Sequence, residues 1–249
     1  MARKTKQEAL ETRERILDAA ETLFQRRGVS RTSLQDVAQQ AEVTRGAIYW
    51  HFKDKAELFD AMMQRGTMPL EEGVSLHAPP AEALSLAELR WGLVNVFYCA
   101  MHNERTRRVF EIAMQKVEYT GEMQALHERK QGARRTWREQ NKAAFDRAVA
   151  QGQLPTGLDT QGAAIALVSM VDGLLHQWIS DPDSFDLLAV GSTVVDNFLT
   201  SLGRAAGPSL LPPMSAAELA RLGQQAVCSL GTAPPSPAAT ASENHGPAD

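Results

Sequence analysis

The chain has 249 residues, with 26 Lys and Arg against 30 Asp and Glu, giving a formal net charge of −4. This length suits one or two domains with their own core, and the acidic balance excludes a histone-like or ribosomal protein. Two cysteines, Cys99 and Cys228, exclude a disulfide framework and favour a reducing compartment. There is no apolar run of about 18 residues to span a bilayer, and the charged N-terminus lacks a signal peptide's apolar stretch. We therefore expect a cytoplasmic protein with no membrane partner.

The charge is unevenly distributed along the chain. Residues 1–55 contain 11 basic and 8 acidic residues, a net charge of +3, whereas residues 56–249 carry −7. A basic segment on an acidic body is typical of a protein in which one end meets phosphate. Arg3, Lys4 and Lys6 form a basic arm that is suited to a DNA backbone or minor groove.

Four helices are predicted at the start of the chain. The first covers residues 12–27, where Ile16, Ala19, Ala20, Leu23 and Phe24 recur at helical spacing before Gly28 ends the helix. The second, 34–41, begins at a capping box of Thr32 and Gln35. Thr44 caps a third at 45–52, and Asp54 with Glu57 caps a fourth. Two short helices joined by a tight turn and braced by longer ones predict a helix-turn-helix at about residues 33–52.

The third predicted helix carries residue types suited to DNA recognition. Arg45 near its N-terminus can fork onto guanine edges, and Gly46 beside it lets the backbone approach the groove. Hydroxyls and charges near helix starts can hold phosphates, and the candidates are Thr32, Ser33, Thr44, Tyr49 and Lys55. The alternative for single residues is structural: Tyr49 and Trp50 only pack between helices, and the two threonines only cap.

Residues 12–59 resemble the DNA-binding domain of the TetR family of bacterial transcriptional repressors, above all in TRGAIYWHFKDKAEL at 44–58. The resemblance implies an all-helical homodimer that binds palindromic double-stranded operator DNA and leaves it when a small molecule binds the C-terminal domain. It further implies that Arg45 and Gly46 face bases, and that phosphates are faced by Thr32, Ser33, Thr44, Tyr49, His51 and Lys55. The family usually has Gly where this chain has Glu42, and a left-handed backbone there costs a side chain about 1 kcal/mol.

The rest of the chain is predicted to be helical apart from a linker and a tail. Gly, Pro and Ser at 66–80 indicate a linker or loop. Helices follow at about 82–102, 104–118, 122–151, 160–180 and 184–203, with no strand alternation. The fold class is therefore all-α, with a three-helix DNA-binding domain at 1–55, a larger ligand-binding and dimerisation domain at 56–203, and a Pro/Ala-rich, largely disordered tail at 204–249.

The composition of three regions allows more specific predictions: an exposed helix, a dimer interface and an extra helix in the tail. The charged segment 122–151 should lie mostly in solvent, with a thin apolar stripe at Leu126, Ala133, Trp137 and Ala144. Residues 163–179 are apolar nearly all round, so we expect 160–180 and 184–203 to form a homodimeric four-helix interface. The alternative is that 160–180 is only the core helix of a monomer. In the tail, 215–230 can form one helix that begins at Ser215 and Glu218.

In the second domain the sequence resembles one particular group within the TetR family. Segments 105–112, 152–159 and 163–188 resemble the AcrR/TtgR group of TetR repressors, which implies sensing of varied antimicrobials and control of a multidrug efflux pump. By position it implies a ligand site at Leu93, Val96, Phe110, Met114, Val168, Val171, Asp172 and Leu175. Asp172 stands out because a carboxylate in an apolar run needs a partner or a ligand, whereas the apolar members are equally explained as core. Phe110, Met114, Arg134 and Asn141 depart from the group's pocket, so its ligand spectrum does not transfer.

Three functions other than an efflux repressor can be compared with the sequence. The six histidines show no metal-ligand spacing and no catalytic motif is present, so we expect no metal, no cofactor and no enzymatic activity. A nucleoid-like DNA binder would need a basic body, and the body carries −7. A regulator of a metabolic or signalling operon that responds to a metabolite or lipid stays open. The main prediction is a ligand-responsive repressor of a multidrug efflux operon, released by small hydrophobic antimicrobials.

Overall fold

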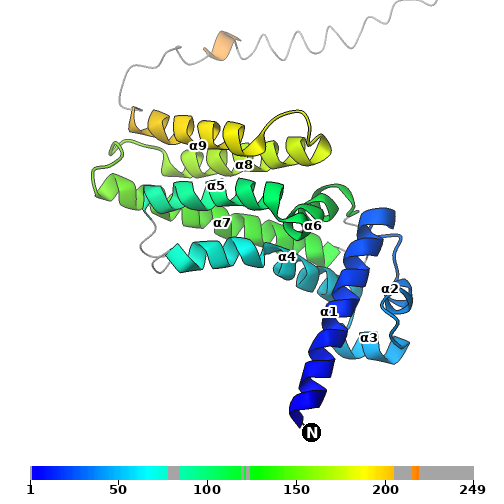
Figure 1. Ribbon diagram of the computed structural model, residues 1–249. Helices are drawn as coiled ribbons and strands as arrows, with labels where there is room; N and C mark the ends of the chain where they lie inside the picture. The colour runs from blue at the N-terminus through cyan, green and yellow to red at the C-terminus, as the bar shows by residue number, and fades with distance from the viewer. Residues whose placement is uncertain (1, 78–84, 119–120, 122–123, 205–214, 219–249) are drawn as a thin grey trace, which may run out of the picture. The chain divides into compact units, whose positions relative to one another are not determined.

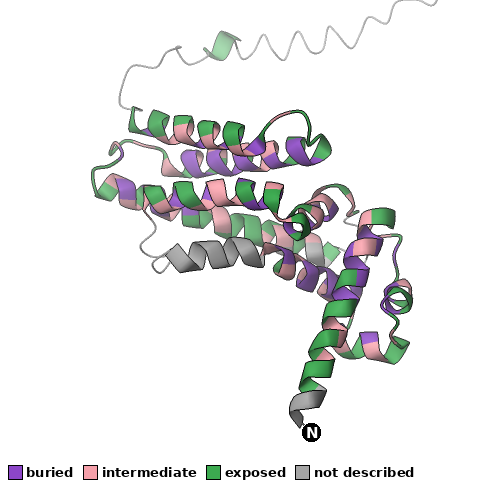
Figure 2. Ribbon diagram, in the orientation of Figure 1, coloured by how far each residue is buried: buried purple, intermediate pink, exposed green. Residues whose placement is uncertain are grey.

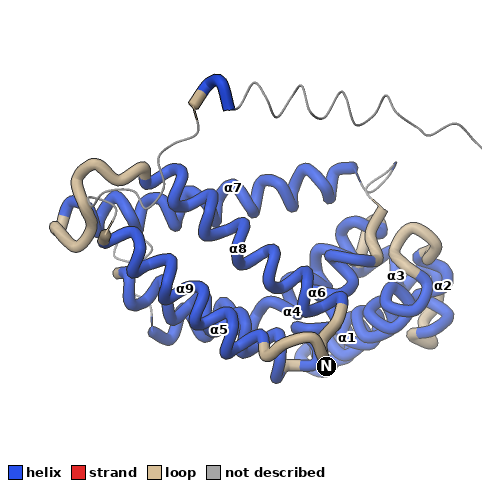
Figure 3. Tube along the Cα trace, turned by 90° about the horizontal axis from the view of Figure 1, so that it is seen from above, coloured by secondary structure: helices blue, strands red, loops and turns tan. Residues whose placement is uncertain are grey.

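The computed structural model describes residues 2–77, 85–118, 121, 124–204 and 215–218, and every regular element in these residues is helical (Figures 1 and 3). The N-terminal helices are α1 (Ala2–Arg27), α2 (Leu34–Gln40), α3 (Arg45–His51) and α4 (Lys55–His77). They are followed by α5 (Leu86–His102), α6 (Glu104–Gln115), α7 (Gln124–Ala150), α8 (Thr160–Ser180) and α9 (Leu187–Gly203). The predicted all-α fold class is confirmed.

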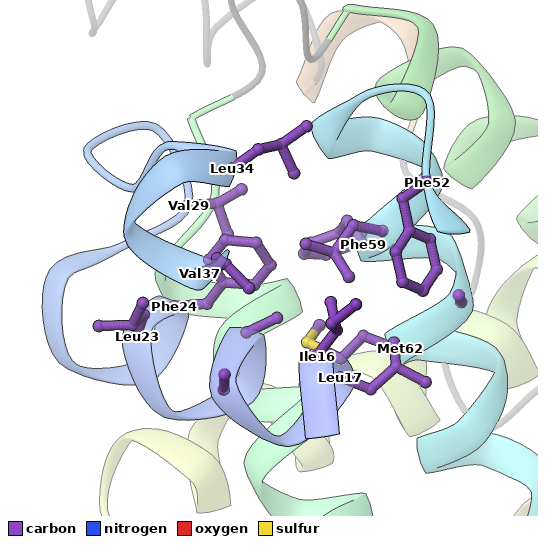
Figure 4. Packing of buried hydrophobic residues seen from close by; sticks show 14 of the residues in the cluster. Ile16, Leu17, Leu23, Phe24, Val29, Leu34, Val37, Phe52, Phe59 and Met62 are labelled. Atoms are coloured by element: carbon purple, nitrogen blue, oxygen red, sulfur yellow. The ribbon is translucent and has the colours of Figure 1, made fainter. Parts of the chain in front are cut away.

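The first three helices and the start of α4 pack around one apolar core, which we call the head core. Its side chains come from each of these elements and point toward one another in Figure 4, which labels Ile16, Leu17, Leu23, Phe24, Val29, Leu34, Val37, Phe52, Phe59 and Met62. Val109, Ile112 and Ala113 of α6 belong to the same cluster. The head core therefore extends past residue 55 and onto a helix of the C-terminal part.

Local caps set the ends of the short helices in the head. Thr44 Oγ1 accepts a hydrogen bond from Ala47 N at 3.1 Å, and Asp54 Oδ1 accepts from Glu57 N at 2.7 Å, so both predicted caps are confirmed. The predicted box at the start of α2 is wrong by one residue. Ser33 is the cap: its Oγ accepts from Asp36 N at 3.1 Å, and Asp36 Oδ2 accepts from Ser33 N at 2.8 Å.

The turn between α2 and α3 contains a strained residue. Glu42 has φ 55, the left-handed conformation that the family's usual glycine adopts without cost. Val43 N donates to Ala38 O at 3.0 Å across this turn, which is the six-to-one bond of a Schellman motif. The close spacing of the two short helices therefore depends on one unfavourable backbone conformation.

Two predicted boundaries in the N-terminal half are wrong. The expected basic arm is helical from Ala2, because α1 is continuous to Arg27. The expected linker at 66–80 is helical as far as His77, because α4 runs through it. Gly66 is needed for packing and not for a loop: a Cβ at this position would lie 2.6 Å from Val109 Cγ2 on α6. Thr106 Oγ1 also donates to Gly66 O at 2.8 Å, so α4 and α6 are in intimate contact.

A second apolar cluster, the body core, lies among α5, α7, α8 and α9. Gly191 allows α9 to approach α5, since a Cβ there would lie 2.5 Å from the ring of Phe97. Helix α8 begins at Asp159, whose Oδ1 accepts from Gly162 N at 2.9 Å. By length and hydropathy α8 resembles a membrane span, but its buried residues, purple in Figure 2, pack into the body core. Helices α5 and α9 begin later than predicted, at the caps Ser85 and Asp186.

Helix α7 is exposed along much of its length, as predicted, but its apolar stripe differs from the prediction. Ala133 is exposed, whereas Trp137 is partly buried and Ala144 is buried. The stripe continues through Phe145 instead, and it includes Asn141, which is 2% exposed and donates from Nδ2 to Trp137 O at 2.9 Å. The side chain of Leu126 lies outside the described residues.

The chain divides into two units, residues 1–207 and 208–249. In the second unit, Ser215 N donates to Glu218 Oε2 at 2.7 Å and Glu218 N donates to Ser215 Oγ at 3.2 Å, so the predicted capping box is present. The remainder of the predicted helix at 215–230 lies outside the described residues, as does most of the tail. The domain boundaries at 55 and 203 stay predictions.

Candidate nucleic-acid interface and effector site

Helix α3 turns one side toward the head core and leaves the rest in solvent. Ile48 is its buried member, and the exposed residues are Thr44 at the cap followed by Arg45, Gly46, Tyr49 and Trp50. The guanidinium carbon of Arg45 lies 5.8 Å from the centroid of the Tyr49 ring, one turn further along, a contact that orients the arginine. An oriented arginine in the first turn of an exposed, capped helix is suited to contact guanine edges in a major groove.

Gly46 has no role inside the described structure. The nearest neighbour of a Cβ added there is Thr44 Oγ1 at 3.9 Å, so a side chain would meet no steric obstacle. Glycine within a helix costs about 1 kcal/mol relative to alanine. A glycine that the described packing does not require, on an exposed helix, is compatible with the prediction that DNA approaches the backbone here, which stays a prediction.

Trp50 belongs to the same surface, although it is not among the DNA contacts predicted from the sequence. Its side chain is 73% exposed and contacts the ring of His51 edge-on, with centroids 4.6 Å apart. An aromatic side chain left this exposed indicates a contact surface. The signal was available in the sequence, because Trp50 is four residues after Gly46 and therefore on the same helix face.

Two of the predicted phosphate contacts are contradicted by burial. Thr32 is 1% exposed and its hydroxyl donates to Gly28 O at 2.9 Å. Lys55 is 7% exposed and its Nζ donates to Thr32 O at 3.1 Å and Ser30 O at 3.4 Å. A buried ammonium that binds backbone carbonyls holds the loop before α2 in place, and it is not presented to solvent. Both residues position the head and do not form its surface.

The remaining polar candidates differ in what they can offer a phosphate. Ser33 is exposed, but its hydroxyl donates to Asp36 Oδ2 at 2.6 Å, and this bond lowers the pKa of Asp36. Thr44 Oγ1 accepts from the backbone and so keeps its own proton for an outside acceptor. His51 is partly buried, and burial followed by the charge of Arg13 lowers its pKa. His51 is therefore neutral at neutral pH and offers an N–H group, not a positive charge.

An ion-pair network joins the head to α6, and it was not anticipated from the sequence. Arg65 of α4, whose side chain is 9% exposed, binds Glu21 and Glu14 of α1, the latter through Nη1–Oε2 at 2.8 Å. Arg105 Nε and Arg108 Nη1 of α6 lie 3.7 and 3.8 Å from the two oxygens of the same buried Glu21. Burial alone would lower the pKa of Arg65, but its bonds to Glu14 and Glu21 outweigh burial and raise it.

The predicted effector residues come together around the body core. Leu93, Val171 and Leu175 belong to that core, and Val96, Phe110 and Met114 pack against it. Val168 is also buried. They are contributed by α5, α6 and α8, so residues far apart in sequence share one region. The apolar members therefore act at least as core residues.

Asp172 has the partner that its chemistry required. Its Oδ2 lies 2.9 Å from Arg134 Nη2, and the two side chains are 30% and 53% exposed. Arg134 is on α7, so the pair links α7 to α8. The expected carboxylate in an apolar helix is thus neutralised by a basic residue of the chain itself. Within the described residues no group of three His, Cys, Asp or Glu side chains is placed to hold a metal ion.

A tight turn, a short capped helix with an exposed arginine and a glycine without an internal role define a helix-turn-helix DNA-binding regulator. Comparison with known proteins agrees: residues 16–62 match the family described as "Bacterial regulatory proteins, tetR family". Residues 85–203 match "MAATS-type transcriptional repressor, C-terminal region". The chain belongs to the TetR family, whose members are operator-binding transcriptional regulators and not enzymes.

Relatives resemble this chain over nearly their whole length. The HTH-type transcriptional regulator TtgR of Pseudomonas putida is 41% identical over 202 residues, which are 81% of this chain and 96% of TtgR. The crystal structure of NalD, the secondary repressor of the MexAB-OprM multidrug efflux pump in Pseudomonas aeruginosa, matches at 33% identity with a TM-score of 0.70, covering 80% of this chain and 98% of NalD. The SmeT–triclosan complex matches at 31% identity with a TM-score of 0.69, covering 82% and 99%.

Proposed function

We propose that this protein represses a multidrug efflux operon by binding a palindromic operator as a homodimer in the cytoplasm, and that small hydrophobic effectors release it. The observation that carries the proposal is the surface of α3, where Arg45, Gly46 and Trp50 are all exposed to solvent and a Cβ at Gly46 would meet no obstacle. NalD and SmeT, which align with 80% and 82% of this chain, are described as repressors of multidrug efflux pumps. SmeT is also described in a complex with triclosan, a small hydrophobic compound.

The proposed DNA contacts follow from exposure. Arg45 reads base edges, Gly46 allows close approach, and Trp50 packs against the groove wall. Phosphates are held by the Thr44 hydroxyl and by the Tyr49 and His51 side chains, with Ser33 beside them. Apart from Ser33, which caps α2, these groups lie at the cap of α3 or within it, so one helix supplies most of the contacts.

The proposed dimer uses the outer faces of α8 and α9. Ile165 on α8 and Val190 on α9 are large apolar side chains that remain 44% and 39% exposed in the single chain. Pairing these faces across a two-fold axis would bury them and form a four-helix interface. A two-fold axis also presents two α3 helices to the DNA, which requires an operator with two inverted half-sites.

The proposed coupling between effector and DNA runs through α6. Phe110 and Met114 of this helix pack against the body core, where the effector is expected to bind. Val109 of the same helix contacts α4 at Gly66, and Arg105 and Arg108 reach Glu21 of α1. An effector that displaces α6 therefore moves α1 and α4 together, and this changes the separation of the two recognition helices.

The test is release of the protein from the DNA that flanks its own gene. Fluorescence anisotropy should show binding to a fragment with inverted half-sites, and triclosan should dissociate the complex. Asp172→Ala should alter the response to effectors without changing the affinity of the ligand-free protein for DNA. If no antimicrobial compound releases the protein from DNA but a metabolite or lipid does, the protein is a metabolic or signalling regulator and not an efflux repressor. Equal responses of Asp172→Ala and wild type to every compound would contradict the effector site.

The dimer is tested by light scattering on the full chain. We expect a dimer that Ile165→Lys together with Val190→Lys converts to a monomer, while both forms keep the same helical circular dichroism. A wild-type monomer at micromolar concentration would contradict the interface.

A further inference from the structure

The inward-facing side of α7 changes character halfway along the helix. Toward its C-terminal end, Asn141, Phe145 and Ala148 are buried against the body core. Moving back along the same face in steps of three and four residues, the positions are occupied by Arg138, Arg134, Lys130 and His127. The face that is packed at one end of α7 is therefore basic at the other.

This basic half of α7 borders a cavity of about 380 Å³, lined by His127, Lys130, Gln131, Arg134, Arg135 and Arg138. That volume is in the range of small-molecule sites. The described lining residues include no carboxylate, and Arg134 forms a 2.9 Å ion pair with Asp172. Among the residues that the structure describes, neither Arg135 nor Arg138 forms an ion pair. Two guanidinium groups, those of Arg135 and Arg138, therefore border the cavity without a carboxylate partner in the described part of the chain.

The cavity adjoins the predicted effector residues. Lys130 Nζ donates to Ala113 O at 3.0 Å, which places it against the α6 segment that carries Phe110 and Met114. Arg134 connects the cavity to Asp172 on α8. Trp137, which is partly buried against the body core, directly precedes the lining residue Arg138 on α7. A ligand in the cavity would therefore have cations on one side and aromatic and thioether groups nearby.

We propose that the effector of this protein is an amphipathic anion, with a carboxylate or phenolate held by the α7 basic residues and an apolar body against Phe110, Met114 and Trp137. This rests on the proposed function and names the ligand class of its effector site. Arg134 and Arg138 lie at four-residue spacing, where like charges repel, and a bound anion relieves this repulsion. Arginine also matches a carboxylate with two parallel hydrogen bonds, which gives the site its selectivity.

The Arg134–Asp172 pair explains why a cation is disfavoured. The carboxylate that would attract a cationic drug is already bound to a guanidinium of the chain. Substituting Arg134 leaves the Asp172 carboxylate without its ion-pair partner and also lowers the positive charge of the cavity. The same substitution should therefore weaken anion binding and create cation binding, a reversal that a general loss of structure cannot produce.

The experiment compares three probes that share one ring system and differ in charge: 2-naphthoate, 2-naphthol and 2-naphthylmethylammonium. Isothermal titration of the full-length wild-type protein in a phosphate-free buffer should give affinity for 2-naphthoate at least about tenfold above that for the ammonium probe. Arg138→Gln and Arg135→Gln should each weaken 2-naphthoate severalfold, with little effect on 2-naphthol. Arg107→Gln, an exposed arginine on α6, is the matched control and should change none of the three. Arg134→Val should reverse the preference between anion and cation.

Wild-type binding of the ammonium probe as tight as that of 2-naphthoate would overturn the inference, as would no binding of any probe. Equal effects of Arg107→Gln and Arg138→Gln would also overturn it, because the attraction would then be nonspecific. These failures are distinct from failure of the proposed function. A protein that leaves its operator with neutral or cationic antimicrobials keeps the proposed function and loses this inference, whereas one that no compound releases loses the function itself.

Discussion

The head and the body of this protein place their functional side chains differently. On α3 the residues proposed to contact DNA, Arg45, Gly46 and Trp50, are exposed and lie outside the head core, which other residues form. In the body, the predicted effector residues Val171 and Leu175 are themselves core. The head can therefore change its specificity without losing its fold, whereas an effector in the body acts directly on the packing. Under the proposed function, this difference would let a ligand alter the packing of the body while a rigid surface of the head contacts DNA.

The substitution with the largest expected effect tests the ion-pair network of Arg65 and Glu21, which joins the head to α6. Arg65→Met leaves buried Glu21 without its nearest cation, so the free energy of unfolding should fall by about 3 kcal/mol. Arg90→Met is the matched control, because it breaks a solvent-exposed pair with Asp196 and should cost less than about 1 kcal/mol. Urea denaturation followed by circular dichroism measures both. Equal losses for the two variants would show that the Arg65 network is no stronger than a surface pair.

Gly46→Ala separates the surface role of the head from its stability. Alanine fits without a clash and should raise the free energy of unfolding by up to about 1 kcal/mol, while operator affinity falls by roughly tenfold. Gly132→Ala on α7, also free of neighbours, should stabilise the protein similarly and leave DNA binding unchanged. Unchanged operator affinity for Gly46→Ala would remove α3 from the interface.

Glu42→Gly tests the strain in the turn between the two short helices. Since Glu42 is left-handed, glycine should raise the free energy of unfolding by about 1 kcal/mol or somewhat less. Gln39→Gly, three residues earlier in α2, should lower it by a similar amount, because that residue is helical. Thermal unfolding of the two variants decides the sign. A lower melting temperature for Glu42→Gly would mean that the turn is not strained.

The smallest expected effect is a pH dependence at the edge of the head surface. Burial lowers the pKa of His51, so as the pH falls the unfolded chain binds a proton before the folded protein does. His51 therefore lowers stability as the pH falls below the ordinary histidine pKa, and stability should rise with pH between about 5 and 7. His51→Gln should flatten this slope by a few tenths of a kcal/mol. A slope identical to wild type would place His51 in open solvent.

The head was largely predictable because its signals are local. Gly28, Thr44 and Asp54 end or begin helices through neighbours within a few residues in sequence, and the structure confirms each. The error at Thr32 arose because two adjacent hydroxyls can both cap, and only burial of Thr32 in the folded head decides between them. Glu42, which the sequence analysis predicted to be costly if its backbone is left-handed, does have a positive φ of 55.

The body was less predictable because its determinants are long-range. Gly66 indicated a loop, and its actual role is to admit Val109 from another helix. Asp172 was expected to need a partner, but nothing local to α8 points to Arg134 on α7. The apolar pattern of α8 gave its bounds correctly, yet its composition alone does not separate a core helix from a dimer interface.

The central claim is that α3 reads the operator. Arg45 is exposed and its guanidinium contacts the Tyr49 ring on the same helix, so Arg45→Ala should keep the melting temperature and the oligomeric state of wild type. Footprinting on the inverted half-sites should then show loss of specific protection, with affinity reduced by about a hundredfold or more. Specific protection of the same palindrome by Arg45→Ala at wild-type concentration would contradict the account.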